Sequence, residues 1–304
     1  MKNQKALVLF SGGLDSRLAV KLLEKQRIEV LAVTFKLPFS GGCCNTEICT
    51  SDFPKENLKV IDCTKGKLFK EYIDVIKKPK HGRGTSLNPC IDCRIFIIKK
   101  AKDLMKKLKC NIIATGEVLG ERPMSQNKKA LGIVEKQTGI EILRPLSAKL
   151  LPDTVYEKKG LIDKEHLEGI QGRTRKRQIQ LAKMFKISYP NPGGGCVLCE
   201  KEYSKKLIDL FKHEKNITPK HIELLRRFRH FRKKGRIILG KDHQENLLLE
   251  KLNKKLKYNI LIPDIPGPTA IYDNKEDARL TKDLVCAYSS KDIKQRKKFE
   301  KIKI

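Results

Sequence analysis

A glycine-rich loop near the start of the chain has residue types suited to binding phosphate. It follows an apolar run, precedes residues with helical spacing, and reads Ser11, Gly12, Gly13, Leu14, Asp15 and Ser16. Glycines let backbone amides approach an anion, serine hydroxyls donate further hydrogen bonds, and a helix N-terminus adds partial positive charge. An ordinary glycine turn with a serine or aspartate cap would explain any two of these residues but not all six. The loop has no Walker A lysine, so it predicts another class of phosphate site.

Ten cysteines form a second set of reactive side chains. Two pairs have CxxC spacing, Cys90 with Cys93 and Cys196 with Cys199, and this spacing indicates metal, cluster or redox chemistry. The first pair stands at a predicted helix start, where amide donors and the helix dipole favour thiolate. Cys196 follows three glycines, which allow the backbone to turn tightly around a bulky partner.

Three interpretations of these pairs are open. All four cysteines would make a closed zinc site, although the pairs are far apart in sequence. A redox pair would carry a persulfide between two thiols. A [4Fe-4S] cluster bound by cysteine thiolates is the third interpretation. Three further cysteines are expected to be buried small hydrophobes: Cys63, Cys110 and Cys286. Cys43 and Cys44 would be sulfur relay residues or bystanders.

Two basic segments are candidates for contact with RNA. The first forms a predicted helix start, where cations oppose the helix dipole, and consists of Arg173, Arg175, Lys176 and Arg177. The second spans residues 226–236 and overlaps the predicted helix 219–232, on which Phe228 and Phe231 would face the core. Its outward residues would then be Arg226, Arg229, Arg232 and Lys233. A solvated face is the alternative, but a patch this dense favours a polyanion partner.

The composition agrees with such a partner. The 304 residues include 66 Lys and Arg against 35 Asp and Glu, a formal net charge of +31. A field of this sign attracts nucleic acid, although a lysine-rich thermophile surface would also explain it. No window approaches the roughly 20 apolar residues of a membrane span, so we expect a cytoplasmic protein with reduced thiols and no membrane partner.

The elements that position these residues alternate between strands and helices. Strands are predicted at 5–10, 28–34, 59–62, 111–115 and 140–143, and helices at 14–26, 68–77 and 95–108. This alternation predicts an α/β fold with a parallel sheet and helices on both faces. After a helix at 173–185 the glycines of 191–195 interrupt the chain. We therefore expect two domains, residues 1–192 and a small basic α+β domain at 193–304. The latter has predicted helices at 205–213, 219–232 and 245–252 and strands at 236–239 and 258–261.

The loop motif SGGLDS in this setting resembles that of the PP-loop ATP pyrophosphatases. The resemblance implies a Rossmann-like domain of the adenine nucleotide alpha hydrolase type, which cleaves ATP between its α- and β-phosphates. The loop would hold pyrophosphate, Asp15 would help to place Mg²⁺, and Thr34 and Phe35 would contact adenine.

Further motifs narrow the resemblance. Thr115-Gly116-Glu117, Leu119-Gly120, Ser125-Gln126 and Leu143-Arg144-Pro145-Leu146 are similar to segments of tRNA 4-thiouridine synthetases, and the PCxxC element is similar to that of tRNA 2-thiouridylases. Gly116 and Glu117 are therefore expected near the nucleotide. The THUMP region that usually precedes the loop in the synthetases is expected to be missing, since the loop begins at residue 11.

The resemblance implies an ATP-dependent tRNA sulfurtransferase. The enzyme would adenylate a base oxygen of tRNA and replace it with sulfur from sulfide or a persulfide carrier, with Asp15 and Cys196 as catalytic residues and a homodimer possible. The [4Fe-4S] cluster is similar to that of cluster-dependent tRNA thiolases, in which a CxxC pair and one distant cysteine leave the fourth iron open. We favour this interpretation of the cysteines, with Cys90, Cys93 and Cys196 as ligands and Cys199 as a substitute. Two rivals remain: a zinc-containing PP-loop enzyme acting on a small molecule, and a noncatalytic RNA-binding protein with a relict loop.

Overall fold

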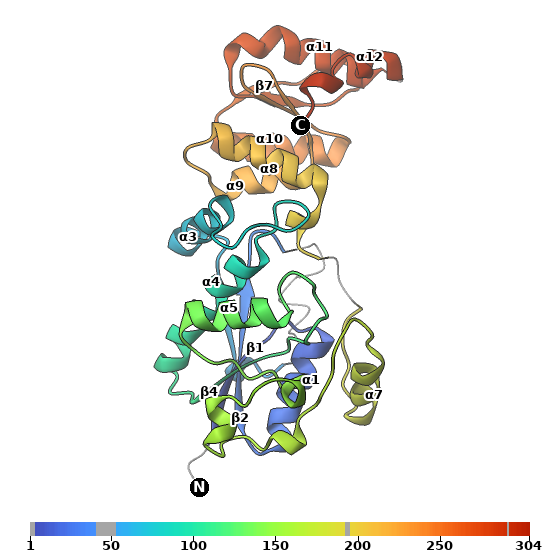
Figure 1. Ribbon diagram of the computed structural model, residues 1–304. Helices are drawn as coiled ribbons and strands as arrows, with labels where there is room; N and C mark the ends of the chain where they lie inside the picture. Colours follow the sequence, from blue (N-terminus) through green and yellow to red (C-terminus); the bar gives the residue numbers. More distant parts are fainter. Residues whose placement is uncertain (1–3, 41–52, 192–194, 291) are drawn as a thin grey trace. The chain divides into compact units, whose positions relative to one another are not determined.

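The chain folds into two compact units, Met1–Cys199 and Glu200–Ile304. Figure 1 presents the computed structural model, which describes residues 4–40, 53–191, 195–290 and 292–304. The sequence-based boundary after residue 192 differs from this division, which assigns Cys196 and Cys199 to the first unit. No helix among these residues is long and apolar enough to cross a membrane.

The first unit is built on a four-stranded parallel sheet with strand order β3-β2-β1-β4. Its strands are β1 (Lys5–Leu9), β2 (Glu29–Lys36), β3 (Leu58–Asp62) and β4 (Ile112–Thr115). Val8 of β1 pairs with Ala32 and Ala114 of its two neighbours, and β1 is buried along most of its length. The expected strand at 140–143 is wrong, because Leu143 forms only an isolated bridge to Ala114.

Helices cover both faces of this sheet, as predicted. They are α1 (Leu14–Lys25), α3 (Gly66–Lys77), α4 (Cys90–Lys107), α5 (Lys128–Thr138), α6 (Val155–Lys158) and α7 (Lys176–Met184). In Figure 1, α1 and α7 lie on one side of the strands, and α4 and α5 lie on the other. Because the strands are parallel, their carboxyl ends meet at one edge of the sheet. Ligands of open α/β sheets bind at this edge.

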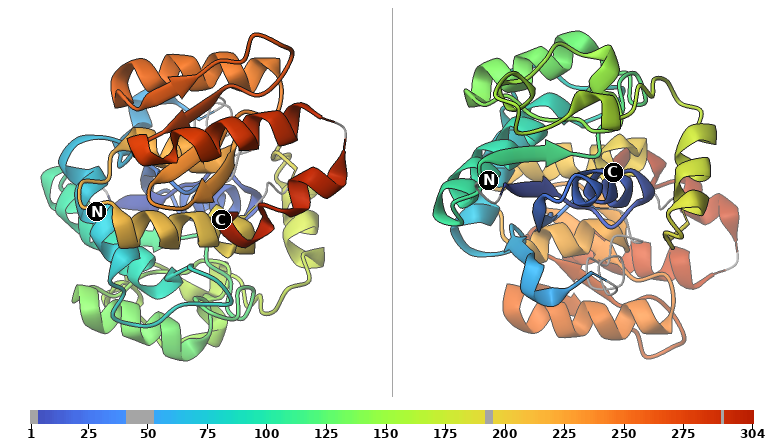
Figure 2. Two further views of the ribbon diagram at one scale, coloured as in Figure 1. Left: turned by 90° about the horizontal axis from the view of Figure 1, so that it is seen from above. Right: turned by 90° about the horizontal axis from the view of Figure 1, so that it is seen from below.

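The second unit contains a four-stranded antiparallel sheet with strand order β5-β6-β8-β7. Its elements are α8 (Lys201–His213), α9 (Pro219–Arg226), β5 (Arg229–Arg232), β6 (Arg236–Leu239), α10 (His243–Leu256), β7 (Asn259–Leu261), β8 (Ala270–Tyr272), α11 (Ala278–Ser289) and α12 (Ile293–Lys297). Ile238 belongs to a core cluster with Leu249 of α10, whereas Ile237 belongs to a cluster with Leu284 of α11. Helices thus cover both faces of this sheet as well, as Figure 2 shows. The predicted α/β fold class with a C-terminal α+β region is confirmed.

The expected helix over residues 226–232 is wrong. Helix α9 ends at Arg226, and the chain then forms the β5–β6 hairpin. Phe228 and Phe231 are fully buried as expected, but in the two different core clusters. A spacing of three residues does not distinguish a helix from a strand. It places two side chains on one face of a helix, but on opposite faces of a strand, and both can be buried in either case.

Candidate active site

The predicted phosphate loop connects β1 to α1. Gly12 has a φ of 77°, a conformation that favours glycine, and Gly13 is the N-cap of α1, which begins at Leu14. The Ser16 hydroxyl donates to the Gly13 carbonyl at 2.8 Å, and Arg17 Nε donates to the Gly12 carbonyl at 2.6 Å. The loop is thus held by its own side chains at a helix N-terminus, the geometry of an anion site.

A cavity of about 310 Å³ opens beside this loop. Seven of the ten expected nucleotide-binding residues line it: Ser11, Asp15, Ser16, Thr34, Phe35, Gly116 and Glu117. Gly12, Gly13 and Leu14 belong to the loop but are not among the described lining residues. Sequence reasoning assigned no site role to Arg94, Glu121, Arg122 and Gln126, which also line the cavity.

Gly116 lies directly against the start of α1. A Cβ atom at this position would come within 2.6 Å of the Asp15 carbonyl carbon and of the Ser16 backbone nitrogen. Real Cβ atoms essentially never approach backbone so closely. The glycine after β4 is therefore required by the close packing of this turn on the phosphate loop.

Glu117 is a buried anion between two arginines. Its carboxylate lies 2.9 Å from Arg94 Nε and 3.2 Å from Arg144 Nε, and it accepts a hydrogen bond from the Thr115 hydroxyl. Burial alone would raise the pKa of the Glu117 carboxyl, but the two guanidinium groups outweigh burial and lower it. Glu117 therefore orients Arg94 at the cavity wall.

Asp15 stands where a metal ligand would be needed. Burial, followed by repulsion from Glu121, raises the pKa of Asp15 to about 6, although Arg175 opposes this shift. Nη2 of Arg175 lies 3.8 Å from Asp15 Oδ2 and 3.2 Å from Glu121 Oε1. Asp15 Oδ1 is buried and has no hydrogen-bond partner among the described residues. Two carboxylates with an unused oxygen beside a phosphate loop fit Mg²⁺, which prefers oxygen ligands.

The two CxxC segments meet in the first unit. Cys90 and Cys93 begin α4, and the 3₁₀ helix Val197–Cys199 follows Cys196. The Leu87 N–H donates to the Leu198 carbonyl at 3.1 Å, which ties the loop before α4 to this helix. Burial is the largest cause that raises the pKa of Cys196 to about 12, and the thiols of Cys93, Cys199 and Cys90 contribute to the same shift.

The surroundings of Cys93 are apolar rather than thiolate-stabilising. Its sulfur lies 3.1 Å from the hydroxyl of Tyr72, whose ring is 5.3 Å from that of Phe96. Burial raises the pKa of the Cys93 thiol, although Tyr72 and Arg94 oppose the shift. The pKa of Cys93 is therefore raised, opposite to the expected thiolate, because desolvation outweighs the contacts with Tyr72 and Arg94.

The remaining cysteines divide between core and surface. Cys63 and Cys110 are buried as expected. Cys286 is exposed, because α11 buries Leu284, Val285 and Ala287 instead. Cys43 and Cys44 lie outside the described residues. Within the described residues, no group of three or more His, Cys, Asp or Glu side chains is arranged to hold a single metal ion. This arrangement gives no support to the four-cysteine zinc site, which the sequence left open as an alternative to the cluster.

The first basic cluster is divided between the cavity and an ion pair. Arg175 contacts Asp15 and Glu121, while Arg177 binds Glu168 with Nε at 3.0 Å and Nη2 at 2.8 Å. Arg173 precedes them, and Lys176 is the first residue of α7. Sequence reasoning found this cluster from its charge, but the pairing of each side chain depends on residues distant in sequence.

The second basic segment faces outward only in part. Arg229 donates to the Gly240 carbonyl at 2.7 Å, and its guanidinium lies 5.0 Å from the ring centre of Tyr288. Arg232 binds Asp209, so the expected outward orientation is wrong for these two arginines. The strand positions are half-buried, and buried guanidinium groups require partners. Arg226 and Lys233 are exposed.

Known proteins similar to this chain are found by family model and by sequence. The family model described as Thiamine biosynthesis protein (ThiI) matches residues 1–150. A "Probable tRNA sulfurtransferase" of Alkaliphilus metalliredigens (strain QYMF) is 31% identical over 155 residues, which are 48% of this chain and 36% of that protein. A "tRNA-specific 2-thiouridylase MnmA 2" of Caldanaerobacter subterraneus subsp. tengcongensis is 26% identical over 234 residues, covering 70% of this chain and 60% of that protein.

Among solved structures, the chain is similar to one described as "Crystal structure of a 4-thiouridine synthetase - RNA complex with bound ATP". The identity is 17% and the TM-score is 0.40, with 89% of this chain and 55% of that chain covered. The chain spans about a third of the length of the first curated relative and 60% of the second.

Proposed function

We propose that this chain, whose residues 1–150 form a ThiI-like PP-loop domain distantly related to tRNA sulfurtransferases and 2-thiouridylases, is an ATP-dependent tRNA sulfurtransferase. The observation that carries the proposal is the phosphate loop packed against Gly116, with Asp15 and Glu121 beside it. In the proposed reaction, a base oxygen attacks the α-phosphorus of ATP and pyrophosphate leaves. A sulfur nucleophile then attacks the adenylated carbon, so that a C–S bond forms and AMP leaves.

The residues of the nucleotide cavity have distinct roles in this proposal. The loop amides and the hydroxyls of Ser11 and Ser16 bind phosphate, and Arg94, oriented by Glu117, neutralises charge that develops as pyrophosphate departs. Asp15 and Glu121 hold Mg²⁺, which neutralises further phosphate charge when bound. Thr34 and Phe35, at the end of β2, contact adenine. Arg175 offsets the negative charge of Asp15 and Glu121.

Sulfur delivery is assigned to the thiols of Cys90, Cys93 and Cys196. The hydrogen bond between Leu87 and Leu198 ties the two cysteine segments together, and thiolates are soft donors that suit iron. We therefore propose a [4Fe-4S] cluster on these thiols, with Cys196 as the third ligand. When bound, such a cluster supplies an open iron that can accept sulfide. The raised pKa of Cys196 means that ligation must displace its proton, as metal binding to thiols generally does. A zinc site and a persulfide relay are the competing occupants of the same thiols.

The partner in the proposal is tRNA, bound in part by the second unit. Residues 200–304 contain 28 Lys and Arg against 15 Asp and Glu. Such an excess attracts phosphate and makes affinity depend on salt. Arg173, Lys176, Arg226 and Lys233 are the members of the predicted RNA-binding set that we assign to backbone contact.

The decisive experiment measures pyrophosphate release and thiolated nucleosides together. The full chain, purified without oxygen, is incubated with Mg-ATP, sulfide and unmodified tRNA. We expect pyrophosphate release that requires tRNA, and a thiolated nucleoside detected by mass spectrometry. Asp15→Asn should abolish both products, while Asp103→Asn, the same change on the exposed side of α4, should abolish neither.

Two other outcomes would contradict the proposal. Pyrophosphate release that is independent of tRNA would indicate a small-molecule substrate, and tRNA binding without ATP cleavage would indicate a noncatalytic protein. A colourless anaerobic preparation with one zinc per chain would reject the cluster while leaving the rest of the proposal intact.

A further inference from the structure

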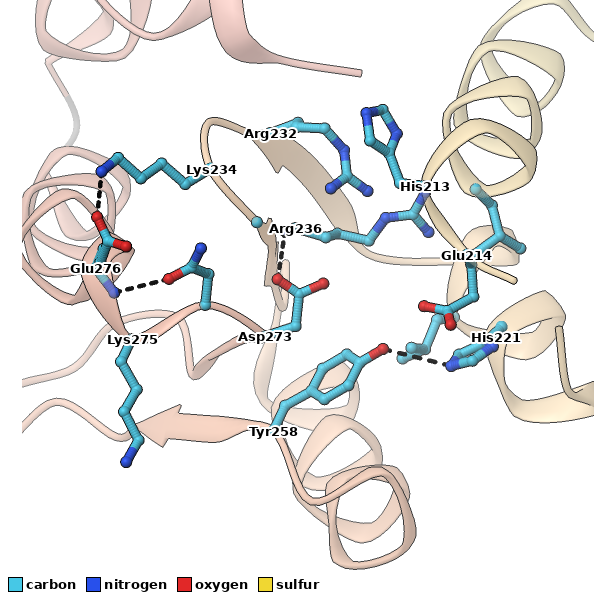
Figure 3. Close-up of a pocket in the computed structure, with 14 residues that line it drawn as sticks. His213, Glu214, His221, Arg232, Lys234, Arg236, Tyr258, Asp273, Lys275 and Glu276 are labelled. Atoms are coloured by element: carbon cyan, nitrogen blue, oxygen red, sulfur yellow. Dashed lines mark hydrogen bonds and ion pairs between the residues drawn. The ribbon is translucent and has the colours of Figure 1, made fainter. Parts of the chain in front are cut away.

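A second cavity has all its described lining residues in the second unit, and none of them is assigned to ATP or sulfur. Its volume is about 570 Å³, and its walls come from α8, α9, the β5–β6 hairpin, Tyr258 and the residues that follow β8. Figure 3 shows charged side chains of both signs around it. A cavity of this size accommodates a nucleotide or a ligand of similar volume.

Two arginines of the hairpin form the basic wall and share one carboxylate. Arg232 donates to Asp209 through Nε at 2.6 Å and Nη2 at 2.8 Å, and Arg236 Nη2 binds the same carboxylate. Arg236 is only 4% exposed, yet its Nε has no hydrogen-bond partner among the described residues. A buried donor without an acceptor is unfavourable, so this N–H is a group that a ligand would satisfy.

Tyr258 contributes a second donor. The backbone N–H of Thr218 donates to His221 Nδ1 at 3.3 Å, so the neutral imidazole carries its hydrogen on Nε2. Burial lowers the pKa of His221, which keeps the ring neutral at pH 7. Nε2 lies 3.3 Å from the Tyr258 hydroxyl and donates to it. The phenol hydrogen of Tyr258 therefore remains available for an acceptor in the cavity.

Carboxylates provide the acceptors. Asp273 Oδ1 accepts from the backbone N–H of Arg236 at 2.7 Å, which fixes the carboxylate at the cavity wall. Glu214, just after α8, faces it across the cavity, and Figure 3 places both carboxylates near the Tyr258 hydroxyl. Burial is the largest cause that raises the pKa of Tyr258 to about 12, and the carboxylates of Asp273 and Glu214 raise it as well.

This set of groups favours a neutral ligand with donors and acceptors over an anion. The charges of the lining nearly balance, since two arginines and two lysines lie against Asp273, Glu214 and Glu276, and Asp209 binds both arginines. Among RNA bases, guanine alone offers two neighbouring N–H donors on one edge and two neighbouring acceptors, O6 and N7, on another. We propose that this cavity binds an unpaired guanine base of RNA.

In the proposed complex, each edge of the base meets a complementary group. The Asp273 carboxylate accepts from N1–H and N2–H of guanine, while Arg236 Nε and the Tyr258 hydroxyl donate to its acceptors. Unpaired RNA bases are recognised by such contacts from aromatic, arginine and carboxylate side chains. The inference deepens the proposed function and rests on it for RNA as the partner.

The test compares four labelled pentanucleotides of RNA that differ only at the central base, G, A, C or U, between uridines. Fluorescence anisotropy with the full chain should give a dissociation constant for the G pentamer about tenfold or more below the other three, the range of a bidentate base contact. Asp273→Asn should reduce this preference to within about twofold. The asparagine oxygen still accepts from Arg236 N–H, but its NH₂ group opposes the donors of guanine.

Two matched variants separate recognition from folding. Asp264→Asn makes the same change at an exposed residue outside the cavity and should keep the preference for G. Tyr258→Phe keeps the ring and removes the donor, so G binding should weaken several-fold, whereas Tyr272→Phe, on a ring packed against the other core cluster, should not weaken it.

Three outcomes would overturn the inference. Equal affinity for all four pentamers would reject guanine recognition, and an unchanged preference in Asp273→Asn would reject this cavity. Free GMP binding as tightly as the G pentamer would identify a nucleotide rather than RNA as the ligand. If tRNA-dependent pyrophosphate release persists in any of these cases, the proposed function stands and only the guanine site fails.

Discussion

Replacing Gly116 with alanine tests whether the turn after β4 positions the phosphate loop. The new Cβ would lie 2.6 Å from the backbone of Asp15 and Ser16, whereas ordinary van der Waals contact begins at 3.4 Å. Backbone cannot rotate away as a side chain can, so the start of α1 must move by the difference, several tenths of an ångström. Overpacking of this kind costs about 1–3 kcal/mol. If that cost is borne in the ATP-bound state, affinity for ATP falls by about 5- to 150-fold.

Gly132→Ala provides the matched control for this substitution. Gly132 is an exposed residue of α5, and a Cβ there would meet nothing within 4 Å. Since alanine is favoured over glycine inside a helix by roughly 0.5–1 kcal/mol, this variant should be slightly more stable than the parent. Isothermal titration calorimetry with Mg-ATP measures both variants, and circular dichroism checks their folding. A folded Gly116→Ala protein with the parent's ATP affinity would refute the positioning argument.

Three further perturbations follow from the same contacts. Glu117→Gln removes the carboxylate partner of Arg94, whereas Arg144 keeps its ion pair with Glu135, so the free energy of unfolding should fall by about 1–3 kcal/mol in urea titrations. Glu71→Gln, which breaks a surface pair, should lower it by under about 1 kcal/mol. The folded-state pKa of Glu117 is lowered, so the difference in the free energy of unfolding between Glu117→Gln and the parent should have its full size at pH 7. The difference should become smaller as the pH falls below about 4.3, where the carboxyl group of the parent's unfolded state is protonated. Mg-ATP affinity should decline as the pH falls through about 6, where Asp15 gains its proton, and a flat calorimetric profile from pH 5 to 8 would contradict this role. Lys233→Ala should reduce the salt dependence of tRNA binding, log K against log salt, by about one unit, and an unchanged slope would exclude a phosphate contact.

The sequence predicts the first unit's sheet well, because buried parallel strands read as continuous apolar runs. It misses α5, whose buried residues are only Ala130, Leu131, Val134 and Thr138, too few for a clear helical stripe. It also assigns helix where β5 begins, since Phe228 and Phe231 fit either periodicity. The choice between them depends on core clusters formed by α10 and α11, which no local pattern contains.

The candidate site divides in the same way between local and distant determinants. The phosphate loop is a contiguous motif, so its residues and their place before a helix were predictable. The two CxxC pairs were also visible, but the pKa of Cys93 depends on Tyr72 and Phe96, and that of Cys196 on burial and on thiols far away in sequence. Spacing indicates which side chains take part, while tertiary packing decides their protonation.

The roles of the basic residues show why net charge is a poor guide to specificity. The chain contains 50 Lys and 16 Arg, so most of its positive field comes from lysines. Flexible lysines neutralise phosphate without reading sequence, whereas arginines are fixed by planar, paired contacts. Arg175, Arg232 and Arg236 all have carboxylate partners within the protein. Affinity for RNA should therefore come from the lysine-rich surface, and selection of a base from groups held in place, of which the partnerless Nε of Arg236 beside Asp273 is the strongest candidate.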